Sequence, residues 1–143
     1  GRFDEATIYL KQAIDHGTDI FEAHYHLGWI HLRKGDLDAA RGEFLKGIRA
    51  NPNASELHYA LGMTYKFQNN IPDARRSLNR ALDLTPFDGE INFTLGLIHE
   101  AQGDRFTALQ FYRKALRLGP GTRVPDRVRV AEAISAIQPT AAP

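Results

Sequence analysis

The sequence contains no cysteine, one methionine and one tryptophan among its 143 residues. Without cysteine, a disulfide framework and a zinc–thiolate site are both excluded. No apolar run in the sequence approaches the roughly 18–20 residues needed to cross a bilayer, so no membrane span is expected in this fragment. The formal net charge is +1, with Lys and Arg spread along the chain. Because nucleic-acid binding usually needs a concentrated basic face, nucleic acid is not an expected partner.

Catalytic motifs are missing as well. The sequence holds no P-loop, no dinucleotide-type glycine pattern and no nucleophile elbow. Serine occurs only at Ser55, Ser77 and Ser135, and no His–Asp pair accompanies any of them in the sequence. We therefore predict that the chain is not an enzyme and that it uses no cofactor.

What the sequence does contain is an internal repeat of 34 residues. Leu-Gly pairs at 27–28, 61–62 and 95–96 set the register. Further columns recur at the same spacing: Ala40, Ala74 and Ala108; Phe44, Leu78 and Tyr112; Gly47, Ala81 and Ala115; Pro52, Pro86 and Pro120; and a turn column of Gly35, Asn69 and Gly103.

A 34-residue period with Leu-Gly in a first helix, Ala, a bulky residue and Ala in a second helix, and a closing Pro resembles the tetratricopeptide repeat (TPR) family. The resemblance covers about residues 1–122 and implies an all-α fold, a right-handed α-solenoid of helix–turn–helix units. The His-Tyr-x-Leu-Gly first helix, His24 to Gly28, resembles bacterial members of the family.

The register predicts how the chain divides, and we expect it to be a fragment that begins inside a unit. A helix with a stripe of Val128, Ala131, Ile134 and Ile137 should close the last unit. The predicted divisions are 1–20, the second helix of a truncated unit; 21–54, 55–88 and 89–122, three complete units; 123–138, a capping helix; and 139–143, a flexible tail.

The columns also have physical roles. The Leu-Gly glycines should let the two helices of a unit approach closely, at a cost of about 1 kcal/mol each in helix propensity. Asp36, Asn70 and Asp104 stand where a second-helix N-cap is wanted. Asn53 with Glu56 resembles a capping box that opens the next first helix.

A metal site is an alternative use of the six histidines, which are His16, His24, His26, His31, His58 and His99. The spacing argues against it, because His24 and His26 would point about 200° apart on a helix. His24 and His58 share one repeat column, and His31 and His99 share another. Packed rings with a polar edge explain these columns better than metal ligands, so no metal is expected.

The resemblance also implies a concave surface lined mainly by first helices, along which a partner lies as an extended or helical peptide. The inward columns are read from the family register onto this sequence. The predicted partner-binding residues are Tyr25, Trp29, Arg33, Tyr59, Met63, Lys66, Phe67, Phe93, Leu97 and Glu100, with an acidic margin of Glu22, Glu56 and Glu90.

Each inward column also has a structural interpretation. The glutamates lie in first helical turns, where they favour the helix dipole, and an aromatic residue in the Tyr25 column is common in the family. The column of Trp29, Met63 and Leu97 is different, because the family often has asparagine there. Large apolar groups on a solvent-facing surface indicate binding. The competing interpretation is tight superhelical curvature, which would bury these side chains against neighbouring first helices.

The leading functional prediction is a scaffold or adaptor module that binds a peptide or helix of a partner protein in the concave groove. The carboxylate clamp for chaperone tails is not expected, because it needs Lys and Asn where this sequence has Tyr25, Trp29, Tyr59 and Met63. A second hypothesis is the non-catalytic recognition arm of a larger transferase or kinase. A third is self-assembly, a homodimer through apolar groups of the unpaired N-terminal helix.

Overall fold

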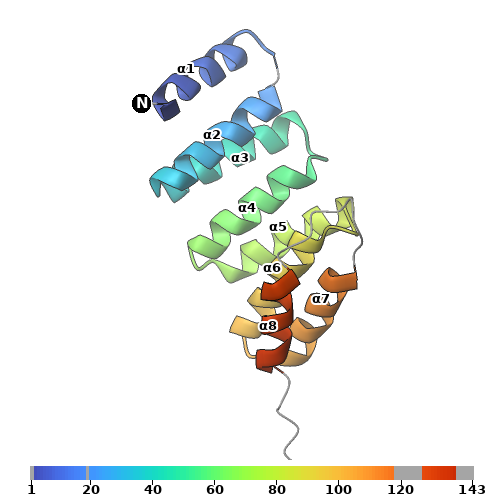
Figure 1. The fold of residues 1–143 in the computed structure, drawn as a ribbon. Coiled ribbons are helices and arrows are strands. Elements are labelled where there is room, and N and C mark those ends of the chain that lie inside the picture. Colours follow the sequence, from blue (N-terminus) through green and yellow to red (C-terminus); the bar gives the residue numbers. More distant parts are fainter. Residues whose placement is uncertain (1, 19, 118–126, 138–143) are drawn as a thin grey trace, which may run out of the picture. The chain divides into compact units, whose positions relative to one another are not determined.

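The computed structural model describes residues 2–18, 20–117 and 127–137, and all regular structure within these ranges is α-helical (Figure 1). The chain separates into two compact units, residues 1–84 and 85–143. The predicted all-α repeat fold is confirmed. Pro120 of the closing column and the predicted tail at 139–143 lie outside the described residues.

The first compact unit holds α1 to α5, and each helix packs against the next for α1 to α4 and for α4 to α5. In Figure 1, α1, α2 and α4 follow one another side by side, and α2 also contacts α4 directly. The bounds of these helices are α1 (Arg2–Asp15), α2 (Ile20–Lys34), α3 (Leu37–Ala50), α4 (Ser55–Phe67) and α5 (Ile71–Leu84).

The glycine column permits the close helix pairs that the sequence predicts. A Cβ added to Gly28 of α2 would lie 2.3 Å from the Phe44 ring of α3. A Cβ added to Gly62 of α4 would lie 2.7 Å from Leu78 Cγ of α5. Phe44 and Leu78 are fully buried, so neither can move aside cheaply. These contacts hold each first helix against its own second helix.

The predicted caps of the second helices are confirmed. The side chain of Asp36 accepts a hydrogen bond from the Ala39 amide at 3.1 Å, and Asp104 accepts one from the Thr107 amide at 3.1 Å. Asn69 has a φ of 58°, so its backbone lies in the left-handed region, as do those of Gly35 and Gly103 in the same turn column.

The capping box predicted at Asn53 is wrong. The N-cap of α4 is Ala54, which makes no side-chain cap. The amide of Asn53 instead donates to Asn51 Oδ1 at 3.2 Å within the preceding turn, and Asn53 Oδ1 accepts from Arg80. The helix therefore starts one residue later than a capping box would require.

The second compact unit holds α6 (Gly89–Ala101), α7 (Arg105–Arg117) and α8 (Arg127–Ile137). Helix α7 contacts both α6 and α8. Its glycine contact repeats the pattern, because a Cβ on Gly96 would lie 2.4 Å from the Tyr112 ring. Asp88 caps α6 by accepting from the Ile91 amide at 3.1 Å.

Helix α8 packs against α7 with half of the predicted stripe, because Ile134 and Ile137 join the core whereas Val128 and Ala131 are exposed. Val130 and Ile137 are buried and join the core around Tyr112, with Ile134 packed beside them. Val128 is 62% exposed, so its place in the predicted stripe is wrong. The alternating Val-Arg-Val at the start of this helix offers two apolar stripes, and the contact with α7 selects the one that contains Val130.

Candidate functional site

The aromatic residues of α2 lie partly on the surface and partly in the core. Tyr25 and Trp29 are half-buried, with ring centroids 6.2 Å apart in an edge-on arrangement. The Trp29 ring also stands edge-on to buried Phe44 at 6.1 Å. Trp29 therefore contributes to the core of the first unit as well as to its surface. Its indole N–H is buried and meets no acceptor within the described residues.

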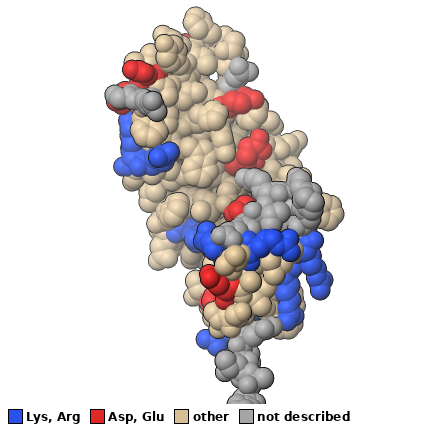
Figure 2. Space-filling view, viewed as in Figure 1, with Lys and Arg blue, Asp and Glu red and all other residues tan. Residues whose placement is uncertain are grey.

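Helix α4, the first helix of its repeat unit, carries the more open part of the predicted surface. Tyr59, Met63 and Lys66 are half-buried, whereas Phe67 is 56% exposed. The Lys66 ammonium lies 6.0 Å from the centroid of the Phe67 ring. When a partner covers a benzyl side chain exposed to this extent, apolar surface is removed from water, which favours binding. On the face shown in Figure 2, the surface over α1 to α4 is mostly uncharged between its edges, with acidic side chains along the right edge and both basic and acidic side chains at the left edge.

Trp29 and Arg33 of α2 also face a groove that the sequence analysis did not predict. The groove lies between α1 and α2 and has a volume of about 480 Å³. The Arg33 guanidinium lies 5.1 Å from the centroid of the Phe3 ring. A signal was present in the sequence, because Ala6 and Leu10 occupy the columns of Ala40 and Phe44. The groove is lined by Phe3, Ala6, Tyr9, Leu10, His26, Trp29, Ile30 and Arg33.

The acidic margin is placed as predicted in first helical turns. Glu22, Glu56 and Glu90 are half-buried at the starts of α2, α4 and α6. This position is compatible with both of their interpretations, stabilisation of the helix dipole and contact with a partner.

A different carboxylate, Glu43 of α3, makes the stronger electrostatic contacts in the first unit. Its Oε2 lies 2.7 Å from His24 Nδ1, and its Oε1 accepts from Lys46 Nζ at 2.6 Å. Partial burial pushes the pKa of Glu43 upward, but the hydrogen bonds from Lys46 and His24 outweigh it, so the pKa lies below its ordinary value. The contact supports the interpretation of His24 as a packed ring with a polar edge.

The predicted binding residues of the second unit are largely committed to its interior. Phe93 is only 4% exposed, its ring centroid lies 5.5 Å from that of Tyr112, and the Arg129 guanidinium of α8 lies 5.5 Å from it. The expectation that Phe93 faces solvent is therefore wrong for this structure, because Arg129 and Tyr112 cover its ring. Leu97 packs against the same core while remaining half-buried.

Glu100 also has an internal partner. The Tyr112 hydroxyl donates to Glu100 Oε2 at 2.5 Å across the α6–α7 pair. Burial raises the pKa of Tyr112 above its ordinary value, and the adjacent Glu100 carboxylate raises it further. The phenol therefore stays protonated at neutral pH and continues to donate this hydrogen bond. We leave Phe93 and Glu100 out of the candidate surface, and the first unit carries it.

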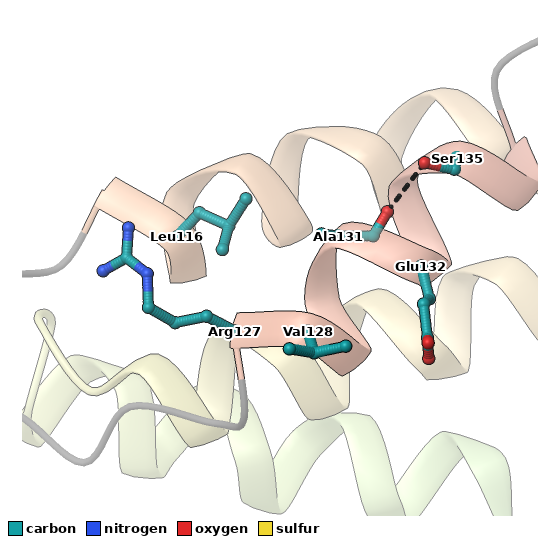
Figure 3. A pocket seen from close by; sticks show the side chains of 6 residues that line it. All are labelled: Leu116, Arg127, Val128, Ala131, Glu132 and Ser135. Atoms are coloured by element: carbon teal, nitrogen blue, oxygen red, sulfur yellow. Dashed lines mark hydrogen bonds between the residues drawn. The ribbon is translucent and has the colours of Figure 1, made fainter.

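The described part of the second unit also has a shallow pocket of about 700 Å³ on α7 and α8 (Figure 3). Leu116 of α7 lies opposite Val128 and Ala131 of α8, with Arg127 at one end and Glu132 toward the other. The Ser135 hydroxyl donates to the Ala131 carbonyl at 3.0 Å, so its hydrogen bond stays within the helix. The pocket is open and offers few fixed polar groups.

The described parts of the chain contain no candidate metal site. No group of three or more His, Asp or Glu side chains there is arranged to hold a metal ion. None of the helices in residues 2–18, 20–117 and 127–137 has the length and hydropathy to cross a membrane. His99 Nδ1 lies 3.2 Å from Asp104 Oδ2 and its ring stacks on Phe111, which is a packing role.

Comparison with known proteins decides the family. The sequence profile of the tetratricopeptide repeat matches residues 1–55 and 59–122. The chain belongs to the tetratricopeptide repeat family. Members of this family generally act as non-catalytic interaction modules. No curated protein matches the sequence at a significant level.

Solved TPR structures share the fold. A crystal structure of MamA superposes with a TM-score of 0.80 at 22% identity, covering 94% of this chain and 76% of that one. The type III secretion translocator chaperone SycD of Yersinia enterocolitica, in an alternative dimer, gives 0.77 at 18% identity, with 84% and 92% covered. The first TPR domain of Spaghetti (RPAP3), bound to an HSP90 peptide, gives 0.73 at 19% identity, with 82% and 92% covered.

Proposed function

We propose that this TPR chain is a scaffold or adaptor module that binds a peptide or helix of a partner protein on the surface formed by α2 and α4. One observation carries the proposal. Phe67 is 56% exposed at the end of α4, next to half-buried apolar residues that occupy the inward repeat columns of α2 and α4. Proteins usually expose apolar groups singly, and a contiguous set marks an interaction site. The residues of this surface are Tyr25, Trp29, Tyr59, Met63, Lys66 and Phe67.

The composition of the surface favours a partner with apolar anchors. Aromatic and methionine side chains give contact area with little demand on geometry. Lys66 beside Phe67 provides a cation for a carboxylate or for backbone carbonyls of the bound segment. The HSP90 peptide bound by the TPR domain of RPAP3 supports peptide binding by this fold. The absent Lys/Asn clamp argues against a chaperone tail as the ligand here.

A capture experiment with matched variants tests this proposal. The immobilised chain is compared with Phe67→Ser and with Phe106→Ser, which changes a more exposed phenylalanine of α7 (75% exposed) outside the predicted surface. Proteins that bind the wild type and Phe106→Ser but not Phe67→Ser are identified by mass spectrometry and titrated as purified proteins. Circular dichroism verifies that both variants fold. Equal capture by all three forms would show that α4 does not carry the binding site.

A homodimer through α1 is a second candidate. Ile8 is 57% exposed and Tyr9 is 71% exposed on this helix. Large apolar groups at such exposure favour association with another surface. Sedimentation velocity of the wild type and of Ile8→Lys tests it: a dimer in the first and a monomer in the second supports pairing through α1. A wild-type monomer at all concentrations rules the homodimer out.

A further inference from the structure

Helix α7 carries positive charges that no carboxylate of the same helix balances. Its cations are Arg105, Arg113, Lys114 and Arg117, and all of these side chains are exposed. The helix dipole favours Lys114 and Arg117 in the last turn, but it disfavours Arg105 in the first turn. Within the described residues, no ion pair involves any of these cations. The charge of α7 is therefore available to a binding partner.

One outward stripe of α7 combines cations with an aromatic ring. Phe106, Gln110, Arg113 and Arg117 follow at spacings of four, three and four residues, which places them on one side of the helix. All of them are exposed, and Phe106 is 75% exposed. With a rise of about 1.5 Å per residue, Arg113 lies about 10 Å and Arg117 about 16 Å along the helix from Phe106. We refer to these residues and the adjacent Lys114 as the α7 stripe.

The other second helices have a different charge pattern at the same repeat positions. Each of α1, α3 and α5 has a carboxylate in the column of Phe106 or in the column of Arg117, whereas α7 has none in either. The combination of an exposed ring with unbalanced cations is therefore particular to α7 among these helices. Shifts of 34 residues align Phe106 with Pro72, Asp38 and Asp4, and Arg117 with Asp83, Arg49 and Asp15.

Helix α7 also lacks a carboxylate that pairs with a cation on α3. Lys46 Nζ of α3 lies 2.6 Å from Glu43 Oε1. Lys114 of α7 stands in the column of Lys46, but the residue in the column of Glu43 is Phe111. The repeat thus keeps the cation at this position and replaces its internal partner with an uncharged side chain.

The outward side of a second helix stays open within a continuing array of repeats. Helix α3 contacts α2 before it and α4 after it, yet Asp38, Lys46 and Arg49 remain exposed. These residues occupy the columns of Phe106, Lys114 and Arg117. A neighbouring repeat unit therefore does not cover the α7 stripe, and the segment that binds there is not part of the repeat array.

We infer that the α7 stripe is a docking site for an acidic segment of a partner protein, one that combines a large apolar residue with two carboxylates. The apolar residue contacts the Phe106 ring, and the carboxylates pair with Arg113 and Arg117. A guanidinium holds a carboxylate through two parallel hydrogen bonds, which gives the contact a defined geometry. Because an extended chain rises about 3.3 Å per residue, the carboxylates lie about three and five residues from the apolar residue.

An anionic membrane surface fits this stripe less well than an acidic protein segment. Helices that lie on a bilayer bury an apolar face about 5–10 Å into the boundary between headgroups and acyl chains. Phe106 is the only apolar residue of the α7 stripe, and it is followed by Gln110 and the cations. The stripe can therefore pair with several negative charges but has little apolar surface to insert.

This site is separate from the α2 and α4 surface of the proposed function. That surface lies on first helices of the first unit, whereas α7 is a second helix of the second unit. An assay that records signals from α7 does not depend on binding at α4. The two proposals can therefore fail separately.

The test is a nuclear magnetic resonance titration of the ¹⁵N-labelled 143-residue chain at low ionic strength, where exposed ion pairs are least screened. The probe is a synthetic peptide of serines with one leucine and with glutamates three and five residues after it. The control peptide has glutamine in place of both glutamates. Co-sedimentation with vesicles of phosphatidylserine and phosphatidylcholine measures membrane binding, and sedimentation velocity measures self-association.

Two double variants carry the same change in net charge. Arg113→Glu with Arg117→Glu reverses the cations of the α7 stripe. Lys11→Glu with Arg49→Glu reverses exposed cations in the same two columns of α1 and α3. A third variant, Phe106→Ser, removes the exposed ring. Circular dichroism and the dispersion of the amide signals verify the fold of each.

We expect the glutamate peptide to shift the amide and arginine Nε–Hε signals of the α7 stripe in the wild type and in the Lys11/Arg49 variant alike. The Arg113/Arg117 variant should bind it at least about tenfold more weakly, because two attractive contacts become repulsive. The control peptide should lose at least as much affinity for the wild type. Phe106→Ser should weaken binding by about threefold or more, because the apolar contact is lost.

Four results overturn the inference. The first is that the glutamate peptide leaves the α7 signals of the wild type unchanged. The second is equal binding to the two double variants, since net charge alone would then explain it. The third is binding to the vesicles without binding to the peptide, which assigns the stripe to a membrane. The fourth is self-association of the chain that the Arg113/Arg117 variant abolishes, because a second copy would then occupy the stripe.

Discussion

Two glycines of the first unit allow the cost of close helix packing to be measured by difference. Gly28 lies in α2 beneath the Phe44 ring, where an added Cβ would meet ring atoms at 2.3–2.6 Å. Gly42 lies inside α3, and an added Cβ there would meet nothing within 4 Å. Both glycines are interior helical positions, so replacing either with alanine gains about 0.5–1 kcal/mol of helix propensity.

The expected effects of the two substitutions have opposite signs. Gly42→Ala should raise the free energy of unfolding by about 0.5–1 kcal/mol, because only the propensity changes. Gly28→Ala receives the same gain but forces a fully buried ring out of its position, and overpacking a core costs about 1–3 kcal/mol. The difference between the two variants removes the propensity contribution, so it should equal about 1–3 kcal/mol.

The assay is urea unfolding of the wild type and both variants, monitored by circular dichroism at one temperature, with the slopes compared to detect loss of two-state behaviour. A third protein combines Gly28→Ala with Phe44→Leu, whose smaller side chain relieves part of the overlap. The double variant should lose less free energy of unfolding than the sum of the losses in the two single variants. If Gly28→Ala is as stable as Gly42→Ala, the helices do not approach this closely and the explanation of the glycine column fails.

The remaining predictions concern caps, packing and pH. Asp36→Ala should cost about 1 kcal/mol of stability because it removes the cap of α3, whereas Asn53→Ala should cost less, and urea unfolding compares them. Val130→Ala should cost about 1–3 kcal/mol through lost burial while Val128→Ala changes little; equal effects would place the other stripe against α7. The lowered pKa of Glu43 means that its ionised contacts stabilise the fold above the ordinary value of 4.5, and that this contribution is lost as pH falls through the folded pKa. Glu43→Gln should therefore flatten the loss of stability below about pH 4.5; an unchanged slope in thermal melts would contradict the assignment.

The features that the sequence predicted correctly depend on short spacings. The pair of Gly28 and Phe44 is separated by a fixed 16 residues, and the cap by Asp36 depends on an amide three residues away. Both are properties of one helix pair, and the repeat shows them in several copies. The column of His24 likewise predicted a packed ring, and the contact with Glu43 is the polar partner that this interpretation requires.

The features that the sequence did not predict depend on which of two alternatives tertiary packing selects. Val128 and Val130 each begin an apolar stripe of α8, and only contact with α7 decides between them. Phe93 shares a column with Tyr25 and Tyr59, yet Arg129 covers its ring because α8 follows this unit. Predicting the groove at Leu10 would have required both the repeat register and the spatial arrangement of α1 and α2.

The 16-residue spacing of the glycine contacts also bears on how the protein is made. Gly28 with Phe44, Gly62 with Leu78 and Gly96 with Tyr112 each close within a single unit. A ribosome adds about 5–20 residues per second, so one 34-residue repeat unit takes about 2–7 s to synthesise. Local helical structure forms in microseconds or less. Each helix pair can therefore bury its glycine contact on the nascent chain before the next unit has been translated, which limits the time that the bulky residues are exposed to aggregation.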